Sequence, residues 1–176
     1  LGNSLFAQKV ISIQGTLDKG YIGNSVSIFQ DSSSSLGYEQ IVQKSSLFKS
    51  NNLAVPNLGR SHNANWLKFE LLNDSYFDDV ILNLSNPIID QTTLYIIRKN
   101  NIDSISINNF TPIRNRVFDH QFYLYDIPLK PGESVTCFLK LQSNEQILAP
   151  LTINSPKRVL SLISSSDIQT GLYLGI

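Results

Sequence analysis

The sequence predicts an all-β fold, an antiparallel jelly-roll β-sandwich with one or two short helices. Polar and apolar residues alternate along residues 66–72, 79–84 and 92–98, as in strands with one buried face. Turn-forming residues at 73–75 and 85–87 separate these runs. No helical pattern lies between consecutive strands, so parallel crossovers are not expected. An immunoglobulin-type sandwich is the alternative, although its Cys–Trp–Cys set is missing.

The N-terminal third predicts short strands and one helix. Strands are expected at residues 10–14 and 26–30, with turns at the intervening glycines. The serines of residues 31–35 are expected to cap a helix over residues 36–44, with Glu39 near its positive end. One face of that helix would dock on the sheet through three side chains, those of Tyr38, Ile41 and Val42. The polar, asparagine-rich residues 49–65 predict a long loop.

The C-terminal half continues the strand pattern. A hairpin turn at residues 99–101 leads to a weakly alternating return strand at 102–107, and residues 108–120 form a second predicted loop. Further strands are expected at three ranges, 121–127, 135–142 and 147–153. Ser155 and Pro156 predict the start of a terminal helix.

Composition narrows the classes of partner. The 176 residues are enough for one domain with a single core. Fourteen basic and fourteen acidic side chains give no net charge, which argues against nucleic acid or an anionic lipid surface as the main partner. The single cysteine, Cys137, lies in an apolar run and predicts a buried structural thiol.

Aromatic residues on predicted strands are the candidate ligand site. By alternation, the non-core face would carry four aromatic side chains, those of Trp66, Tyr95, Tyr123 and Tyr125. Sugars stack on such rings, and Arg116 and His120 of the second predicted loop would lie at the rim. The alternative is that the aromatic residues lie under loops or between sheets.

No motif indicates an enzyme, a cofactor or a metal. A nucleophile elbow, a P-loop, an H-E-x-x-H pair and a dinucleotide fingerprint are all missing from the sequence. His62 and His120 lack the spacing of a metal pair. The acidic turn at residues 73–79 could bind calcium but is better explained as a solvated turn. We expect a binding protein without catalytic residues or cofactors.

The motifs, in order, resemble a known receptor domain, the type 2 extracellular domain of bacterial seven-transmembrane receptors with diverse intracellular signalling modules. The resemblance covers residues 26–176 and is carried by five segments: Val26 to Asp31, Trp66 to Phe69, Asn86 to Tyr95, Pro112 to Phe122, and Leu139 to Leu151. The region 102–107 and Thr111 depart from the family pattern.

The resemblance implies a periplasmic jelly-roll sensor domain, similar to carbohydrate-binding modules, that precedes a seven-helix membrane region. The implied divisions are a lead or signal-peptide remnant at 1–9, the sensor domain at 10–160 and a segment leading to a membrane helix at 161–176. The implied ligand is a carbohydrate or similar polar small molecule, and a homodimer is possible. Two alternatives stay open: a carbohydrate-binding module of a secreted glycoside hydrolase, and a structural or dimerising sandwich without a small ligand.

Overall fold

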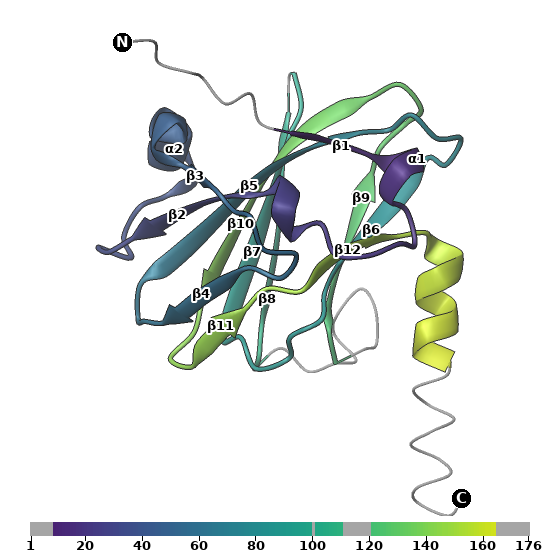
Figure 1. Ribbon diagram of the computed structural model, residues 1–176. Helices are drawn as coiled ribbons and strands as arrows, with labels where there is room; N and C mark the ends of the chain where they lie inside the picture. The colour runs from purple at the N-terminus through teal and green to yellow at the C-terminus, as the bar shows by residue number, and fades with distance from the viewer. Residues whose placement is uncertain (1–8, 100, 111–120, 165–176) are drawn as a thin grey trace, which may run out of the picture.

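The computed structural model describes residues 9–99, 101–110 and 121–164 (Figure 1). In these residues the chain is mostly β-structure, arranged in three sheets. The large, seven-stranded sheet has the order β3 (Lys49–Ser50), β2 (Ser27–Asp31), β5 (Ala64–Leu72), β10 (Ser134–Gln142), β7 (Gln91–Ile97) and β8 (Ile102–Asn108), and β1 (Val10–Ser12) also pairs with β5. A three-stranded sheet has the order β12 (Leu151–Asn154), β6 (Asp79–Leu84) and β9 (Tyr123–Pro128). A two-stranded sheet joins β11 (Gln146–Leu148) to β4 (Asn57–Arg60).

The helical elements are short. They are α1 (Ile13–Thr16), α2 (Tyr38–Gln43), the 3₁₀ turns η1 (Gly23–Ser25) and η2 (Ser45–Leu47), and a helix over residues 156–164. Figure 1 shows α2 at one side of the large sheet and the helix of residues 156–164 beside β6 and β12. None of the helices in the described part of the chain is long and apolar enough to span a membrane.

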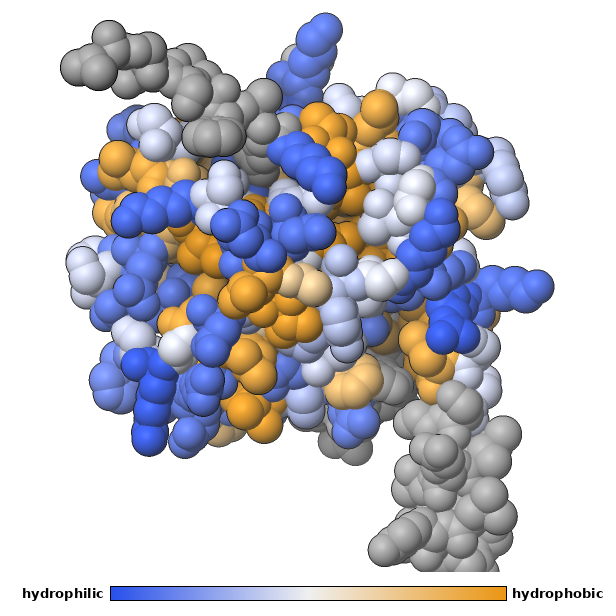
Figure 2. Space-filling model, viewed as in Figure 1, coloured by the Kyte–Doolittle hydropathy of each residue, from blue (hydrophilic) through white to orange (hydrophobic). Residues whose placement is uncertain are grey.

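One core lies between the large and the three-stranded sheets. Side chains from β5, β10 and β7 face those from β6, β9 and β12 in a single cluster of buried residues. Cys137 is part of this core and fully buried, and desolvation raises the pKa of its thiol to about 12. The predicted all-β sandwich and the predicted structural thiol are therefore confirmed, whereas the jelly-roll topology stays a prediction. Outside the core, apolar and polar side chains are intermixed on the face shown in Figure 2.

The antiparallel pattern has one exception. β1 runs parallel to β5, pairing Val10 with Glu70 beyond the point where β2 stops pairing. The strand predicted over residues 10–14 is shorter than expected because Ser12 accepts a hydrogen bond from the Gly15 backbone N–H at 3.0 Å, which begins α1.

The helix predicted over residues 36–44 forms as α2, but two expectations about it are wrong. The serines do not cap it. Instead Gln40 Oε1 accepts a hydrogen bond from the Gly37 N–H at 2.9 Å. Ile41 is buried and docks on the sheet as expected, whereas Val42 is exposed.

One predicted loop and one predicted strand also differ. The expected loop of residues 49–65 contains β3 and β4, which are short and mostly exposed. The single strand expected over residues 147–153 is two strands, since Pro150 lacks the N–H that a continuous ladder needs. As a result β11 joins β4 and β12 joins β6.

Candidate functional site

The outer face of the large sheet, the face turned away from the core, is built from cross-strand rows of side chains. On β5 this face carries Trp66, Lys68, Glu70 and Leu72, which alternate with the buried residues of the core. The register on β10 places Lys140, Phe138, Thr136 and Ser134 beside them, one for each row. β7 adds Thr93, Tyr95 and Ile97 to the first three rows.

The first two rows form an aromatic cluster beneath α2. Tyr95 lies between two rings, with its centroid 5.8 Å from that of Trp66 and 5.1 Å from that of Tyr38 on α2. Ile41 of α2 packs in the same cluster, as do Phe138 and Phe29. The predicted juxtaposition of Trp66 and Tyr95 is thus present, but α2 covers it and leaves Trp66 fully buried.

Of two polar groups in the aromatic cluster, those of Lys140 and Trp66, one has a hydrogen-bond partner and the other has none among the described residues. Lys140 Nζ lies 5.3 Å from the centroid of the Trp66 ring, a cation–π contact, and donates a hydrogen bond to the Leu36 carbonyl oxygen at 3.4 Å. The indole Nε1 of Trp66 is buried and has no acceptor among the described residues. The aromatic cluster is therefore held mainly by ring packing and not by a hydrogen-bond network.

The next two rows form a groove of about 500 Å³ whose lining contains no residue of α2. Its apolar surface comes from Val10, Leu72 and Ile97. Its polar surface includes Glu70, Thr136 and Ser134, and Lys99 follows β7 at the edge. Glu70 and Thr136 are cross-strand partners at the centre of this face. The groove thus offers hydrogen-bonding groups beside an apolar floor, on the same face as the aromatic cluster.

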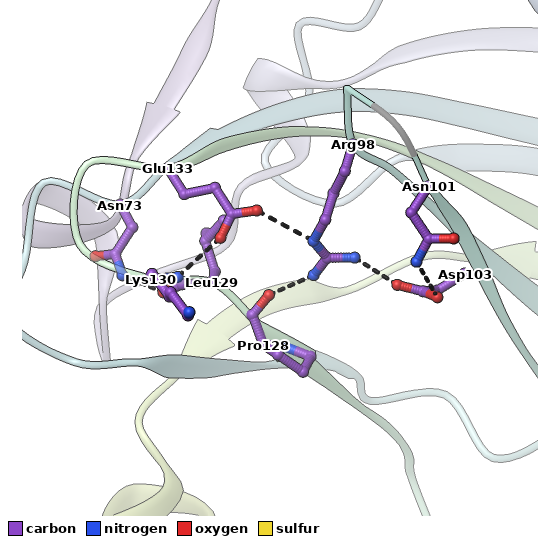
Figure 3. Close-up of polar contacts among 8 residues, drawn as sticks. All are labelled: Asn73, Arg98, Asn101, Asp103, Pro128, Leu129, Lys130 and Glu133. Atoms are coloured by element: carbon purple, nitrogen blue, oxygen red, sulfur yellow. Dashed lines mark hydrogen bonds and ion pairs between the residues drawn. The ribbon is translucent and has the colours of Figure 1, made fainter.

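One wall of the groove is fixed by Arg98, whose guanidinium forms a contact through each of its three nitrogens (Figure 3). Its Nη1 pairs with Asp103 Oδ2 at 2.6 Å and its Nε with Glu133 Oε1 at 3.1 Å, and its Nη2 donates to the Pro128 carbonyl oxygen. Because these contacts use all three nitrogens, Arg98 has a structural role here and does not act as a free cation for a ligand.

Tyr123 and Tyr125 are not on this face, and the prediction of one open aromatic surface with Trp66 and Tyr95 is wrong in this respect. Both tyrosines are fully buried between the sheets. The Tyr123 hydroxyl donates to the Ile89 carbonyl oxygen, and the Tyr125 hydroxyl to Thr92 Oγ1. Tyrosine is amphipathic, so a buried acceptor lets it occupy a core position that alternation alone assigns to an apolar residue.

Arg116 and His120, predicted at the rim, lie outside the described residues. His62 contacts Asn144 Oδ1 through its ring Nδ1 at 2.8 Å. In the acidic turn, Asn73 Oδ1 accepts from Ser75, and Asp74 accepts from Ser12 Oγ at 2.5 Å and from the Gln14 N–H. Within the described ranges no group of three or more His, Cys, Asp or Glu side chains could hold a metal ion.

The sequence patterns do not identify the groove residues as a candidate site. Glu70 and Thr136 are 66 positions apart and carry no motif. Alternation does place Glu70 on the same strand face as Trp66, which was a usable signal. The missing information was that β10 lies next to β5, a pairing that single-sequence periodicity does not specify.

Comparison with known proteins identifies the family of this chain. A family model described as 7TMR-DISM extracellular 2 matches residues 23–155, which include nearly all of the strands. A comparison with curated proteins found no match. The matched region spans more than half of the chain and agrees with the resemblance carried by its motifs. The chain therefore belongs to the 7TMR-DISM extracellular 2 family and is an extracytoplasmic sensor domain of a membrane receptor.

Proposed function

We propose that this domain senses a carbohydrate or a similar polar small molecule, which it binds in the groove on the outer face of the large sheet. The observation that carries the proposal is the groove itself, where the central pair of Glu70 and Thr136 lies beside the apolar side chains of Leu72 and Ile97. Sugars present C–H faces and hydroxyl groups together, and so they suit a surface that is apolar and hydrogen-bonding at once.

The aromatic cluster would support this groove as a fixed edge. Phe138 and Lys68 form the cross-strand row next to that of Glu70 and Thr136, and Lys68 Nζ lies 5.9 Å from the centroid of the Phe138 ring. α2 packs on this cluster, so the edge nearest the groove is ordered before a ligand arrives.

In a receptor of the bacterial periplasm, the bound ligand would pass its signal to the transmembrane region. A ligand can do this only if it binds one conformation of the receptor more tightly than another. The family match favours this function over the alternative of a module attached to a secreted hydrolase. The gene sequence downstream of residue 176 would separate the two, because the receptor function predicts seven apolar spans there and the alternative predicts a catalytic domain.

Glycan arrays followed by calorimetry test the proposed ligand class. We expect saccharide binding that weakens at least tenfold in Glu70→Ala and in the near-isosteric Thr136→Val. The matched control is Glu145→Ala, which removes an exposed carboxylate outside the groove. Trp66, the single tryptophan, provides a fluorescence readout two rows from Glu70.

Two results would overturn the proposal: no binding to any saccharide, or binding that both groove variants leave unchanged. Trp66→Ala and Tyr123→Ala are unsuitable as binding tests, because truncating a fully buried aromatic side chain costs about 3 to 5 kcal/mol of stability. The mass of the domain in solution, measured with and without ligand, tests the dimerising alternative.

A further inference from the structure

We propose a second ligand site, in a polar pocket between the three-stranded sheet and the helix of residues 156–164. Its ligand is a small carboxylate that carries a neighbouring hydroxyl or ammonium group. The pocket has a volume of about 240 Å³, roughly that of eight water molecules. It lies on the opposite sheet from the groove described above, and the inference does not rest on the proposed function.

The floor of the pocket contains a buried acceptor that lacks a partner. Asn83 of β6 is 5% exposed, and no described residue donates a hydrogen bond to its Oδ1. Its cross-strand partner Thr152 and the nearby Asn154 also line the pocket, joined by a 2.9 Å hydrogen bond from Asn154 Nδ2 to Thr152 Oγ1. An unsatisfied buried acceptor is costly, so a ligand O–H or N–H that reaches Asn83 Oδ1 gains strongly from the contact.

The walls supply positive charge. Lys19 and Arg158 are exposed at the pocket, and no described carboxylate forms an ion pair with either. Asp18 is the one acidic residue in the lining, and its two oxygens already accept hydrogen bonds from the Ser155 N–H at 2.8 Å and from Ser155 Oγ at 2.6 Å. A guanidinium with free N–H groups grips a carboxylate bidentately, which assigns the anionic end of the ligand to Arg158.

The position of the pocket links ligand binding to the helix. Val159 and Ile163 pack the helix onto Ile81 and Leu124 of the three-stranded sheet, and Figure 1 shows the helix beside β6 and β12. A ligand held by Asn83 on the sheet and by Arg158 on the helix fixes one relative to the other. The helix directly follows the region that matches the receptor-domain family, so its placement is a route by which binding affects what is joined to the domain.

Calorimetry with four probes tests the chemistry. Glucuronate and serine carry both required groups, whereas glucose lacks the carboxylate and acetate lacks the donor. We expect binding of glucuronate, serine or both, and at least tenfold weaker binding of glucose and acetate. Failure of both two-group probes to bind at about 10 mM overturns the proposal.

Variants test the location. Asn83→Leu replaces the orphan acceptor with an apolar group of similar size and is expected to fold. Arg158→Gln changes an exposed side chain, and Arg60→Gln is its matched control at an exposed arginine far from the pocket. Asn83→Leu and Arg158→Gln should each weaken carboxylate binding at least tenfold, with Arg60→Gln unchanged. Carboxylate binding that is lost in Glu70→Ala but kept in Asn83→Leu overturns this site and leaves the groove standing.

Hydrogen exchange tests the link to the helix. Saturating the protein with the probe that binds should slow amide exchange across residues 156–164, and Arg158→Gln should abolish that slowing. Binding without any change in exchange there overturns the coupling.

Discussion

At the scale of single residues, Gly23 is the position where the backbone leaves no room for a side chain. A Cβ added there would lie 2.2 Å from the Ala54 carbonyl oxygen and 2.7 Å from that of Leu53. Both contacts are with backbone, so relief needs a shift of the chain and not a rotamer change. We expect Gly23→Ala to lower the free energy of unfolding by about 2 to 3 kcal/mol, measured by urea denaturation.

Gly20→Ala is the matched control for this prediction, since no atom lies within 4 Å of a Cβ at Gly20. Its unfolding free energy should stay within about 0.5 kcal/mol of the unchanged protein. Equal stability of the two variants would contradict the steric role of Gly23. The sequence marks both glycines as turn residues and does not separate them, because the constraint comes from residues 53 and 54 across the turn.

The prediction of which strand face points into the core is right for β5 and wrong for β9, and the reason is physical. On β5, Lys68 and Glu70 mark the outer face, so the core face followed from alternation. On β9 both faces are covered, one by the core and one by the helix of residues 156–164, which packs on Leu124. Alternation then carries no information about which face is inside, and Tyr123 and Tyr125 were assigned to the wrong one.

At the scale of elements, Asp31 holds the turn that leads from β2 to α2. Asp31 is 2% exposed, and its carboxylate accepts hydrogen bonds from Ser33 Oγ at 2.6 Å and from the Leu36 N–H at 2.9 Å. Burial raises the pKa of this carboxyl, but the hydrogen bonds from Ser33 and Leu36 outweigh burial and leave the pKa below its ordinary value. The charged form is therefore the one that the fold stabilises.

The lowered pKa of Asp31 predicts that its contribution to stability depends on pH. Because the folded-state pKa is lowered, the stabilisation is present above the unfolded-state pKa of about 3.9 and is lost as the pH falls through the folded-state value. The free energy of unfolding of Asp31→Asn should therefore be lower than that of the unchanged protein by about 1 to 2 kcal/mol near pH 7. The difference between the two proteins should narrow at about pH 3. Glu145→Gln, at an exposed carboxylate, is the control. A difference that is the same at both pH values would count against the charge of Asp31 as its cause.

Among the elements, those with long alternating runs were predicted well, and those without were not. β5, β7 and β10 each have seven or more residues and one buried face. β3 and β4 have two and four residues, mostly exposed, and owe their strand geometry to neighbours that are distant in sequence. Their local sequence contains no period to detect, so only the tertiary pairing reveals them.

At the scale of the whole molecule, the sequence is sufficient to identify the family but not to locate a ligand site. The order of weak motifs from Val26 to Leu151 was enough to identify the family, since it sums over many positions. The groove and the polar pocket depend on which strands are neighbours, and their residues carry no motif of their own. Partners on adjacent strands become visible only when the sheet order is known.

Arg98 ties the two main sheets together at one end, and its loss should be felt by the whole fold. It extends from the end of β7 to Asp103 on β8, to Glu133 just before β10 and to the Pro128 carbonyl of β9 in the other sheet (Figure 3). Its side chain is 19% exposed, so these charge-assisted bonds are partly shielded from water.

We expect Arg98→Ala to lower the free energy of unfolding by about 2 to 3 kcal/mol, measured by chemical denaturation. Arg98→Lys should recover little of this loss, because one ammonium cannot reproduce three directed contacts of a planar guanidinium. Arg60→Ala is the matched control: its ion pair with Glu145 is 3.9 Å long and exposed, and such pairs contribute about 0 to 1 kcal/mol. If Arg98→Ala and Arg60→Ala were equally stable, the link between the sheets would lie in apolar packing alone. Full recovery by lysine would show that charge, and not the guanidinium geometry, joins β9 to the large sheet.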